Sequence, residues 1–153
     1  MQMDFEFEGL DDLIKRCEEV CELTTINKTT KKALNECGEL AYHTVQPLVR
    51  RAEDHSKSGA QHKGWGYRQV PSGHAADNIP LPILRKKKDF IYVVIGWERT
   101  DNSPFFYEKF EEWGTSQRPP YHAFGCTSAK LRPQFEKIIM EHFEELLKKA
   151  IEG

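Results

Sequence analysis

A long amphipathic stripe at the C-terminal end of the chain constrains the fold most. Apolar residues recur there every three or four positions: Leu131, Phe135, Ile138, Ile139, Phe143, Leu146, Leu147 and Ala150. This spacing predicts a helix from about Leu131 to Ile151, roughly 30 Å long at 1.5 Å per residue. Pro133 is tolerated in such a helix because it lies in the first turn.

The N-terminal half carries two further helical patterns. Residues 10–23 predict a short amphipathic helix, with Asp11 and Asp12 in the first turn, where the helix dipole favours anions. Residues 24–27 separate it from the main packing helix, whose apolar positions are Leu34, Cys37, Ala41, Val45, Leu48 and Ala52. Pro47 lacks a backbone donor, so we expect a kink or an end at that point.

Three segments have the pattern of strands. Phe5 and Phe7 alternate with glutamates and predict a short edge strand. Residues 79–84 and 89–97 predict two further strands, joined by a basic turn at 85–88. Residues 90–95 are apolar on both faces, which predicts a central strand covered on each side by helices or by another subunit. Its neighbour contains two prolines and is therefore expected at an edge.

The connections also have distinct patterns. Residues 55–78 are polar, rich in glycine and without apolar period, which predicts a long flexible loop or hairpin arm. This arm contains Trp65, Tyr67 and Arg68, and the two aromatic rings either insert into a partner or fold back on the chain's own core. Residues 105–113 predict a short helix that Gly114 stops.

Taken together, these elements predict one α+β domain over residues 1–153. It consists of a small antiparallel sheet packed against a long helix and a C-terminal helix, with the 55–78 arm. The chain has 153 residues, 39% of them apolar and 30% charged, an ordinary globular composition. No stretch is long enough for a membrane span and no secretory signal opens the chain, so we expect a cytosolic protein without a membrane partner.

Charge is balanced overall but divided along the sequence. The formal net charge is −2, whereas residues 4–22 carry a net of −6 and residues 46–88 a net of +6. Two poles of opposite sign suit head-to-tail self-association or docking on another protein, although two solvated faces explain them equally well. Lys86, Lys87 and Lys88 form the densest basic cluster, which either contacts phosphates or merely solubilises a turn.

No set of residues has the spacing of a catalytic or metal site. The four cysteines lack a metal-binding spacing, and no cofactor or metal is expected. Glu108, Glu111 and Glu112 share the short helix and are expected to be solvated. Cys126 lies near His122, which leaves a hydrolase open as a remote alternative. We therefore expect no enzyme.

One region resembles a known family. The motif consists of Tyr107, Phe110, Glu112, Trp113, Gly114 and Thr115, followed by a proline-rich stretch and then Leu131, Arg132 and Pro133. It resembles the phage head-tail joining and tail-component family of long-tailed phages, which includes neck and tail-completion proteins. The opening segment 5–13 resembles the family's first strand, Gly-Leu pair and helix. Two departures are Ser72, where threonine is usual, and the extra residues 125–130.

The resemblance implies a structural role in the virion. Members of the family are small α+β subunits that form rings, commonly hexamers, at the neck or at the head-proximal end of the tail tube. It implies partners among tail-tube and head-connector proteins, at most weak nonspecific DNA contact, and assembly in the host cytoplasm. Phe5, Phe7, Trp65, Tyr67, Arg68 and Lys86–Lys88 are the expected interface residues. A small nucleic-acid-binding or regulatory module that uses residues 46–88 is the main alternative.

Within the motif, Gly114 has a specific structural role to play. An abrupt helix end requires a residue with positive φ, which glycine adopts without steric cost. We expect Trp113 to pack beneath this end and Thr115 to cap the segment that follows.

Overall fold

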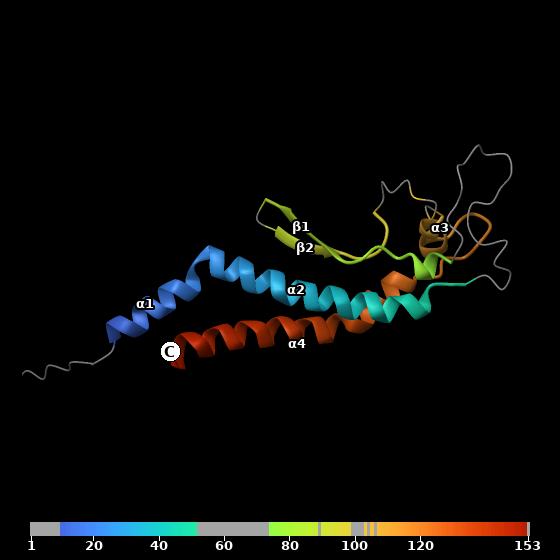
Figure 1. The fold of residues 1–153 in the computed structure, drawn as a ribbon. Coiled ribbons are helices and arrows are strands. Elements are labelled where there is room, and N and C mark those ends of the chain that lie inside the picture. Colours follow the sequence, from blue (N-terminus) through green and yellow to red (C-terminus); the bar gives the residue numbers. More distant parts are fainter. Residues whose placement is uncertain are drawn as a thin grey trace, which may run out of the picture.

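The computed structural model describes residues 10–51, 74–88, 90–98, 103, 105 and 107–152. Within these ranges the chain is α+β, with long helices and a two-stranded antiparallel sheet. Figure 1 shows the layers: the β1–β2 hairpin lies on one side of helix α2 and helix α4 lies on the other. The predicted fold class is confirmed.

The first N-terminal helix is slightly shorter than its pattern predicted, and the second begins earlier. Helix α1 spans Leu10–Cys21, close to the predicted 10–23, but helix α2 spans Leu23–Val45 and so begins well before residue 34. The expected separator at 24–27 was wrong, because Thr25 and Ile26 already donate backbone hydrogen bonds to the Glu22 carbonyl. Only Glu22 itself, at ψ 132°, breaks the helix.

Proline ends α2, as its missing donor predicted. The α-helix stops at Val45, and the 3₁₀-helix Gln46–Leu48 follows with Pro47 inside it. Val49 then turns to extended backbone and buries its side chain. The chain therefore leaves the helix within one turn of the proline.

Helix α4 spans Ala123–Glu152 and begins eight residues before the predicted Leu131. Pro133 consequently lies inside the helix and not in its first turn, so the Ala129 carbonyl lacks its usual helical donor. The residues 125–130, which depart from the family pattern, form the first turns of this helix. A proline in a helix interior costs about 3 kcal/mol, which tertiary contacts must offset.

Small side chains let α2 and α4 approach each other closely. Ala33, Cys37 and Ala41 are buried one helical turn apart on α2 and pack against α4, where Thr127, Leu131 and Ala150 are buried. Glu36 on α2 also accepts a contact of 2.7 Å from the His142 ring on α4. Among the described residues Val45 is the only large side chain that is fully buried, so this core is thin.

The sheet is a hairpin of β1 (Ile83–Lys87) and β2 (Phe90–Val94). The register pairs Ile83 with Val94 and Lys87 with Phe90. The first strand thus begins four residues later than the predicted 79–84 and includes three of the four residues assigned to the turn, and the second strand ends at Val94 and not at 97. Lys88 begins the turn itself at φ +51°. Long basic side chains obscured this strand because they can extend into solvent without breaking the pairing.

One face of the hairpin packs on α2 and the other does not. A Cβ placed on Gly38 of α2 would lie 3.0 Å from side-chain carbons of Pro82 and Val93, so the missing side chain lets the hairpin sit close. The expected central strand was wrong: in the described part of the chain β2 pairs only with β1. An apolar run does not reveal whether its second face is covered.

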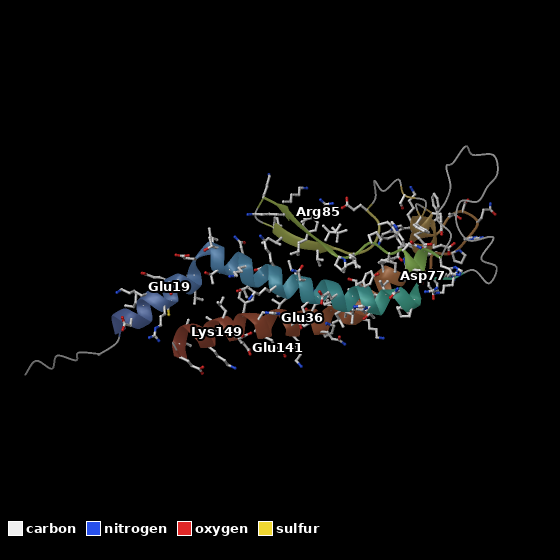
Figure 2. The ribbon with its side chains drawn as sticks, viewed as in Figure 1. Glu19, Glu36, Asp77, Arg85, Glu141 and Lys149 are labelled. Atoms are coloured by element: carbon white, nitrogen blue, oxygen red, sulfur yellow. The ribbon has the colours of Figure 1, made fainter. Side chains whose placement is uncertain are left out.

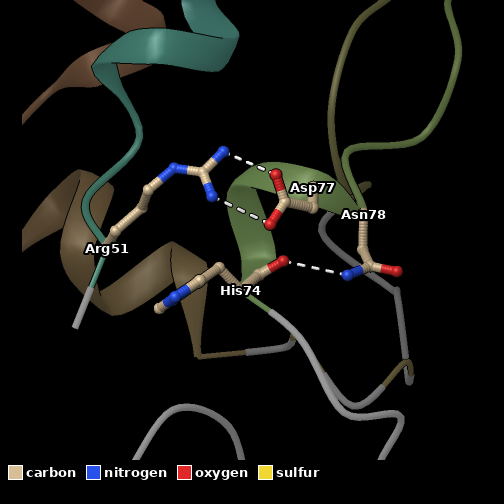
Figure 3. A network of polar contacts seen from close by, with 4 residues as sticks. All are labelled: Arg51, His74, Asp77 and Asn78. Carbon is tan, nitrogen blue, oxygen red and sulfur yellow. Dashed lines mark hydrogen bonds and ion pairs between the residues drawn. The ribbon is translucent and has the colours of Figure 1, made fainter. Parts of the chain in front are cut away.

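The largest buried cluster lies where α2 ends. Val45, Val49, Ile79 and Phe105 form it with Ala75, Ala76 and Ala123, and the rings of Trp97 and Phe124 pack against it. Arg51 closes this end by a bidentate ion pair to Asp77 of the 3₁₀-helix Ala75–Asp77, and Asn78 donates to the His74 carbonyl (Figure 3). The end of α2 therefore contains a cluster of buried apolar side chains from several segments.

Candidate functional site

The family-like motif folds into one junction between two helices. Helix α3 spans Glu108–Trp113, shorter than the predicted 105–113, and the chain then turns at Gly114 and leads to the start of α4. Tyr107 precedes α3, and Leu131, Arg132 and Pro133 lie further along α4. Residues 107–115 of the motif therefore lie together around α3, whereas Leu131, Arg132 and Pro133 lie within α4, away from this turn.

Glu112 caps helix α4 from a distance. Its carboxylate accepts the backbone N–H groups of Phe124 at 3.0 Å and of Gly125 at 2.8 Å. These donors belong to the first turn of the helix, where they have no partner within the helix and where the dipole favours an anion. The expectation that this carboxylate is merely solvated was wrong.

Two separate features require a glycine at position 114, the end of α3. Its φ of 76° and ψ of 176° lie in a region that residues with a Cβ rarely adopt. A Cβ there would also lie 2.8 Å from the Pro120 nitrogen and 2.9 Å from the Arg118 carbonyl oxygen. The prediction of a positive φ at this stop is confirmed, and Thr115 Oγ1 accepts the Gln117 N–H as expected of a cap.

Trp113 does not pack beneath the glycine. It is 74% exposed, and its ring meets the His122 ring edge-on at 6.0 Å between centroids. The prediction of a packed tryptophan was wrong because the turn folds its backbone against Pro120 and leaves the ring outside. The tryptophan is free to contact something other than its own core.

Glu111 ties α3 to the end of α2. Its carboxylate pairs with Arg118 at 3.0 Å and with Arg50 at 3.5 Å, and the Arg50 guanidinium lies 4.2 Å from the centre of the Tyr121 ring. The Tyr121 N–H also donates to the Glu111 carbonyl. The sequence pattern did not indicate this network, since Arg50 lies far from the other three residues in the chain.

Glu108 is the most unusual titratable group of the junction. It is only 9% exposed, and burial raises the pKa of its carboxyl to about 7, helped by the nearby negative charges of Glu111 and Glu112. The prediction of a solvated carboxylate was wrong here as well. The flanking Phe105 and Tyr107 were the one available signal, because they place this side of the segment against the core.

A half-open groove of about 920 Å³ lies beside this junction. We call it the α3 groove. Aromatic rings and carboxylates share its lining, which consists of Ile95, Trp97, Glu98, Glu108, Lys109, Phe110, Glu112, Trp113, Gly114, Phe124, Gly125 and Ser128. It therefore combines an apolar wall with an excess of acidic groups.

The hairpin presents a second exposed surface. Alternation along the strands places Ile83, Arg85, Lys87, Phe90, Tyr92 and Val94 on the side away from α2, and we call this set the outer hairpin face. Phe90 is 74% exposed and Tyr92 44%. Arg85 pairs with Glu98 at 2.7 Å, whereas Lys86, Lys87 and Lys88 are exposed (Figure 2 labels Arg85).

The remaining motif residues have structural places on α4. Leu131 is buried against the rest of the chain, and Arg132 makes an exposed ion pair of 3.5 Å with Glu136. Pro133 is exposed in the helix interior. Phe5, Phe7, Trp65, Tyr67 and Arg68, together with most of the predicted 55–78 arm, lie outside the described residues.

The Cys126–His122 pair does not have the geometry of a described catalytic site. Cys126 is exposed on the first turns of α4, and the His122 ring contacts the Trp113 ring. No group of three or more histidine, cysteine or acidic side chains that could hold a metal occurs in this part of the chain. None of the described helices is both long and apolar enough to cross a membrane.

Comparisons with other proteins complete the description. A scan against protein-family models found no match, and neither a search of curated proteins nor a search of solved structures found one. Function must therefore be argued from the motif and from the surfaces described above.

Proposed function

We propose that the chain is a virion structural protein, a ring-forming subunit at the head-tail junction or at the head-proximal end of a phage tail. It acts by self-assembly and docking, without catalysis. The resemblance of residues 107–115 and 131–133 to the phage family suggests this role. The ring is a homo-oligomer, most simply a hexamer, and tail-tube and head-connector proteins are its partners.

The outer hairpin face is the observation that carries the proposal. It holds exposed rings of Phe90 and Tyr92, and in the described part of the chain both strands have an unpaired edge. Proteins that act alone usually cover such edges or place charges along them, since an open edge pairs with other chains. Strand β1 carries such charges at Arg85, Lys86 and Lys87, whereas β2, with the sequence FIYVV, carries none. A subunit that is completed by its neighbours needs no such cover.

The thin core supports the same view. Large apolar side chains such as Leu81, Met140 and Ile151 are mostly exposed, while small residues fill the α2–α4 contact. Association that covers these exposed side chains of the described residues would stabilise the folded chain.

The nucleic-acid alternative has weaker support from the geometry. Of the basic residues in the 46–88 segment, Arg50 pairs with Glu111, Arg51 with Asp77 and Arg85 with Glu98. A paired guanidinium must lose its partner before it can neutralise a phosphate. Among the described basic residues of this segment the three lysines of the hairpin remain, which suits weak nonspecific contact with DNA in a ring lumen, while Lys57, Lys63 and Arg68 lie outside the described residues.

Light scattering coupled to size-exclusion chromatography tests the proposal. From micromolar to near-millimolar protein, we expect a concentration-dependent shift from monomer to one discrete ring-sized oligomer. The double variant Phe90→Ser with Tyr92→Ser should shift far less, whereas Met140→Ser with Leu147→Ser, which removes equally exposed apolar groups from α4, should behave as wild type.

A different result would favour the alternative. If the wild type stays monomeric throughout and binds duplex DNA with a steep salt dependence, the chain is a nucleic-acid-binding module and the proposed role is contradicted.

A further inference from the structure

The α3 groove has the chemistry of a site for a cationic side chain. Its walls include the rings of Trp97, Phe110, Trp113 and Phe124, whose faces attract an ammonium or guanidinium group. Three carboxylates, Glu98, Glu108 and Glu112, line it against a single lysine, Lys109. Lys109 itself lies 5.3 Å from the centre of the Phe110 ring, at the rim.

The environment of Glu108 independently supports a cation site in the α3 groove. Its side chain is nine-tenths buried and lines the groove, yet within the described part of the chain its carboxyl group accepts no hydrogen bond. Glu112, by contrast, is occupied by the start of α4, and Glu98 by Arg85. No side-chain oxygen that is fully buried in the described part of the chain lacks a partner, so the unpaired Glu108 carboxyl group is open to the groove. A cation that entered the groove could pair with it without displacing a protein donor.

The chain itself carries a matching cation. Lys86, Lys87 and Lys88, which we call the lysine tip, project at the end of the hairpin and are exposed. None of the three has an ion pair within the described ranges. They form the densest run of positive charge in the sequence.

The lysine tip cannot reach the groove of its own chain. Strand β2, Phe90–Val94, lies between the tip and Ile95 of the groove, and its five residues span roughly 16 Å at 3.3 Å per residue. Figure 1 shows the turn between β1 and β2 pointing away from α3, toward the α1 end of α2. Any contact between tip and groove therefore joins two molecules.

We propose that the lysine tip of one copy inserts into the α3 groove of a second copy, its ammonium groups meeting Glu108 and the aromatic walls. This inference rests on the proposed self-assembly and adds the two surfaces that join. Because donor and acceptor lie at different places on each subunit, the contact is head-to-tail. Such contacts generate a closed ring when the rotation between subunits closes.

Two variants that each remove one half of the contact test the pairing. The tip variant replaces Lys86, Lys87 and Lys88 by glutamate; its control replaces the exposed Lys130, Lys137 and Lys148 of α4, with the same change in charge. The groove variant is Trp113→Lys, which places a like charge at the rim; its control is Met140→Lys. All four sites are exposed, so the variants should fold, and circular dichroism checks this.

Light scattering at near-millimolar protein concentration measures the molar mass of the species that each variant forms. We expect the wild type and both controls to assemble, and each of the two variants alone to stay monomeric, with at least a tenfold weaker association. An equimolar mixture of tip and groove variants should form heterodimers and stop there, because only one intact tip and one intact groove remain between them.

Failure of the tip–groove pairing can be distinguished from failure of the proposed ring-forming function. If the wild type assembles and both variants assemble equally well, the pairing is overturned while the proposed ring subunit stands. If the mixture stays monomeric while the wild type assembles, the tip and groove are not partners of each other, which also overturns it. A wild type that remains monomeric and binds DNA overturns both proposals.

Discussion

The α3–α4 junction and the β1–β2 hairpin differ in whether their polar groups and apolar side chains find partners within the described chain. At the junction, Glu112 satisfies the first N–H groups of α4, and Glu111 links Arg118 to Arg50. The hairpin leaves the Phe90 ring and three lysines exposed and, in the described part of the chain, its strand edges unpaired. The polar groups of the junction find their partners within one molecule, whereas the proposed function requires a second molecule to cover the hairpin.

This contrast predicts where mutations act. Changes at the junction should alter the free energy of unfolding of a single chain. Changes on the outer hairpin face should leave that free energy nearly unchanged and alter association instead. The following experiments test the contrast.

The largest effect on stability is expected at Gly114. The variant Gly114→Ala places a Cβ within 3 Å of the Pro120 nitrogen and the Arg118 carbonyl, at a φ that alanine rarely adopts. We expect a loss of about 3 kcal/mol in the free energy of unfolding, measured by urea denaturation at low protein concentration. Gly125→Ala is the control, since its Cβ would lie 3.3 Å from the flexible Glu112 carboxylate and at an ordinary 3.7 Å from the His122 Cβ, with no backbone atom in the way. Equal losses in the two variants would contradict the role given to the turn.

Glu108 should make stability depend on pH. Its pKa is about 7 in the folded chain and 4.5 without the fold, so folding disfavours the ionised form. Stability therefore falls as the pH rises from 4.5 to 7, by up to roughly 3 kcal/mol, and does not recover above that range. Glu108→Gln has no charge to bury and should be more stable than wild type at pH 8 but not at pH 4.

The measurement is the difference between the two unfolding curves as a function of pH. The contributions of the other titratable groups to the pH dependence are the same in both proteins and cancel in this difference. Glu141→Gln on the exposed side of α4 serves as the control. A difference that does not change with pH would show that Glu108 ionises freely in the folded chain.

A smaller effect is expected at Glu112. Glu112→Ala removes the acceptor of the Phe124 and Gly125 N–H groups and should cost about 1 to 2 kcal/mol, as the loss of a helix cap does. Hydrogen exchange of amides in the first turn of α4 should accelerate while amides near Ala150 keep their protection. If protection stays uniform along the helix, the distant carboxylate is not its cap.

The smallest effect on the single chain is expected on the hairpin. Phe90→Ser removes a ring that is 74% exposed and should change the free energy of unfolding by less than about 0.5 kcal/mol. A loss well above 1 kcal/mol at a concentration where the protein is monomeric would show that this face is covered by the chain itself, and the contrast between the two regions would fail.

Much of the fold could be predicted because it depends on short-range patterns. The apolar stripes of α1, α2 and α4 follow from residues three and four positions apart, and Pro47 ends α2 because it lacks a donor. The stop at Gly114 follows from local backbone sterics. The strand pair was predicted, but its register was not, since strand ends depend on cross-strand partners.

The candidate site was predicted only in part for the same reason. Glu112 was singled out in the motif, but its role as a cap of α4 was not, and without that cap Pro133 looked like a residue of the first turn. Glu108 was expected to be solvated, because its burial arises from residues that the sequence places far away. The groove is made by three segments and has no pattern of its own.

The amino-acid sequence by itself determined which segments are helical, where Pro47 and Gly114 stop them, and which residues carry the exposed charge. Each of these depends on neighbours within about one turn of the chain. Only the tertiary structure decided that α4 begins at Ala123, that Glu108 is buried and that the β1–β2 hairpin points away from α3. These depend on contacts between residues distant in sequence, which local propensity does not encode.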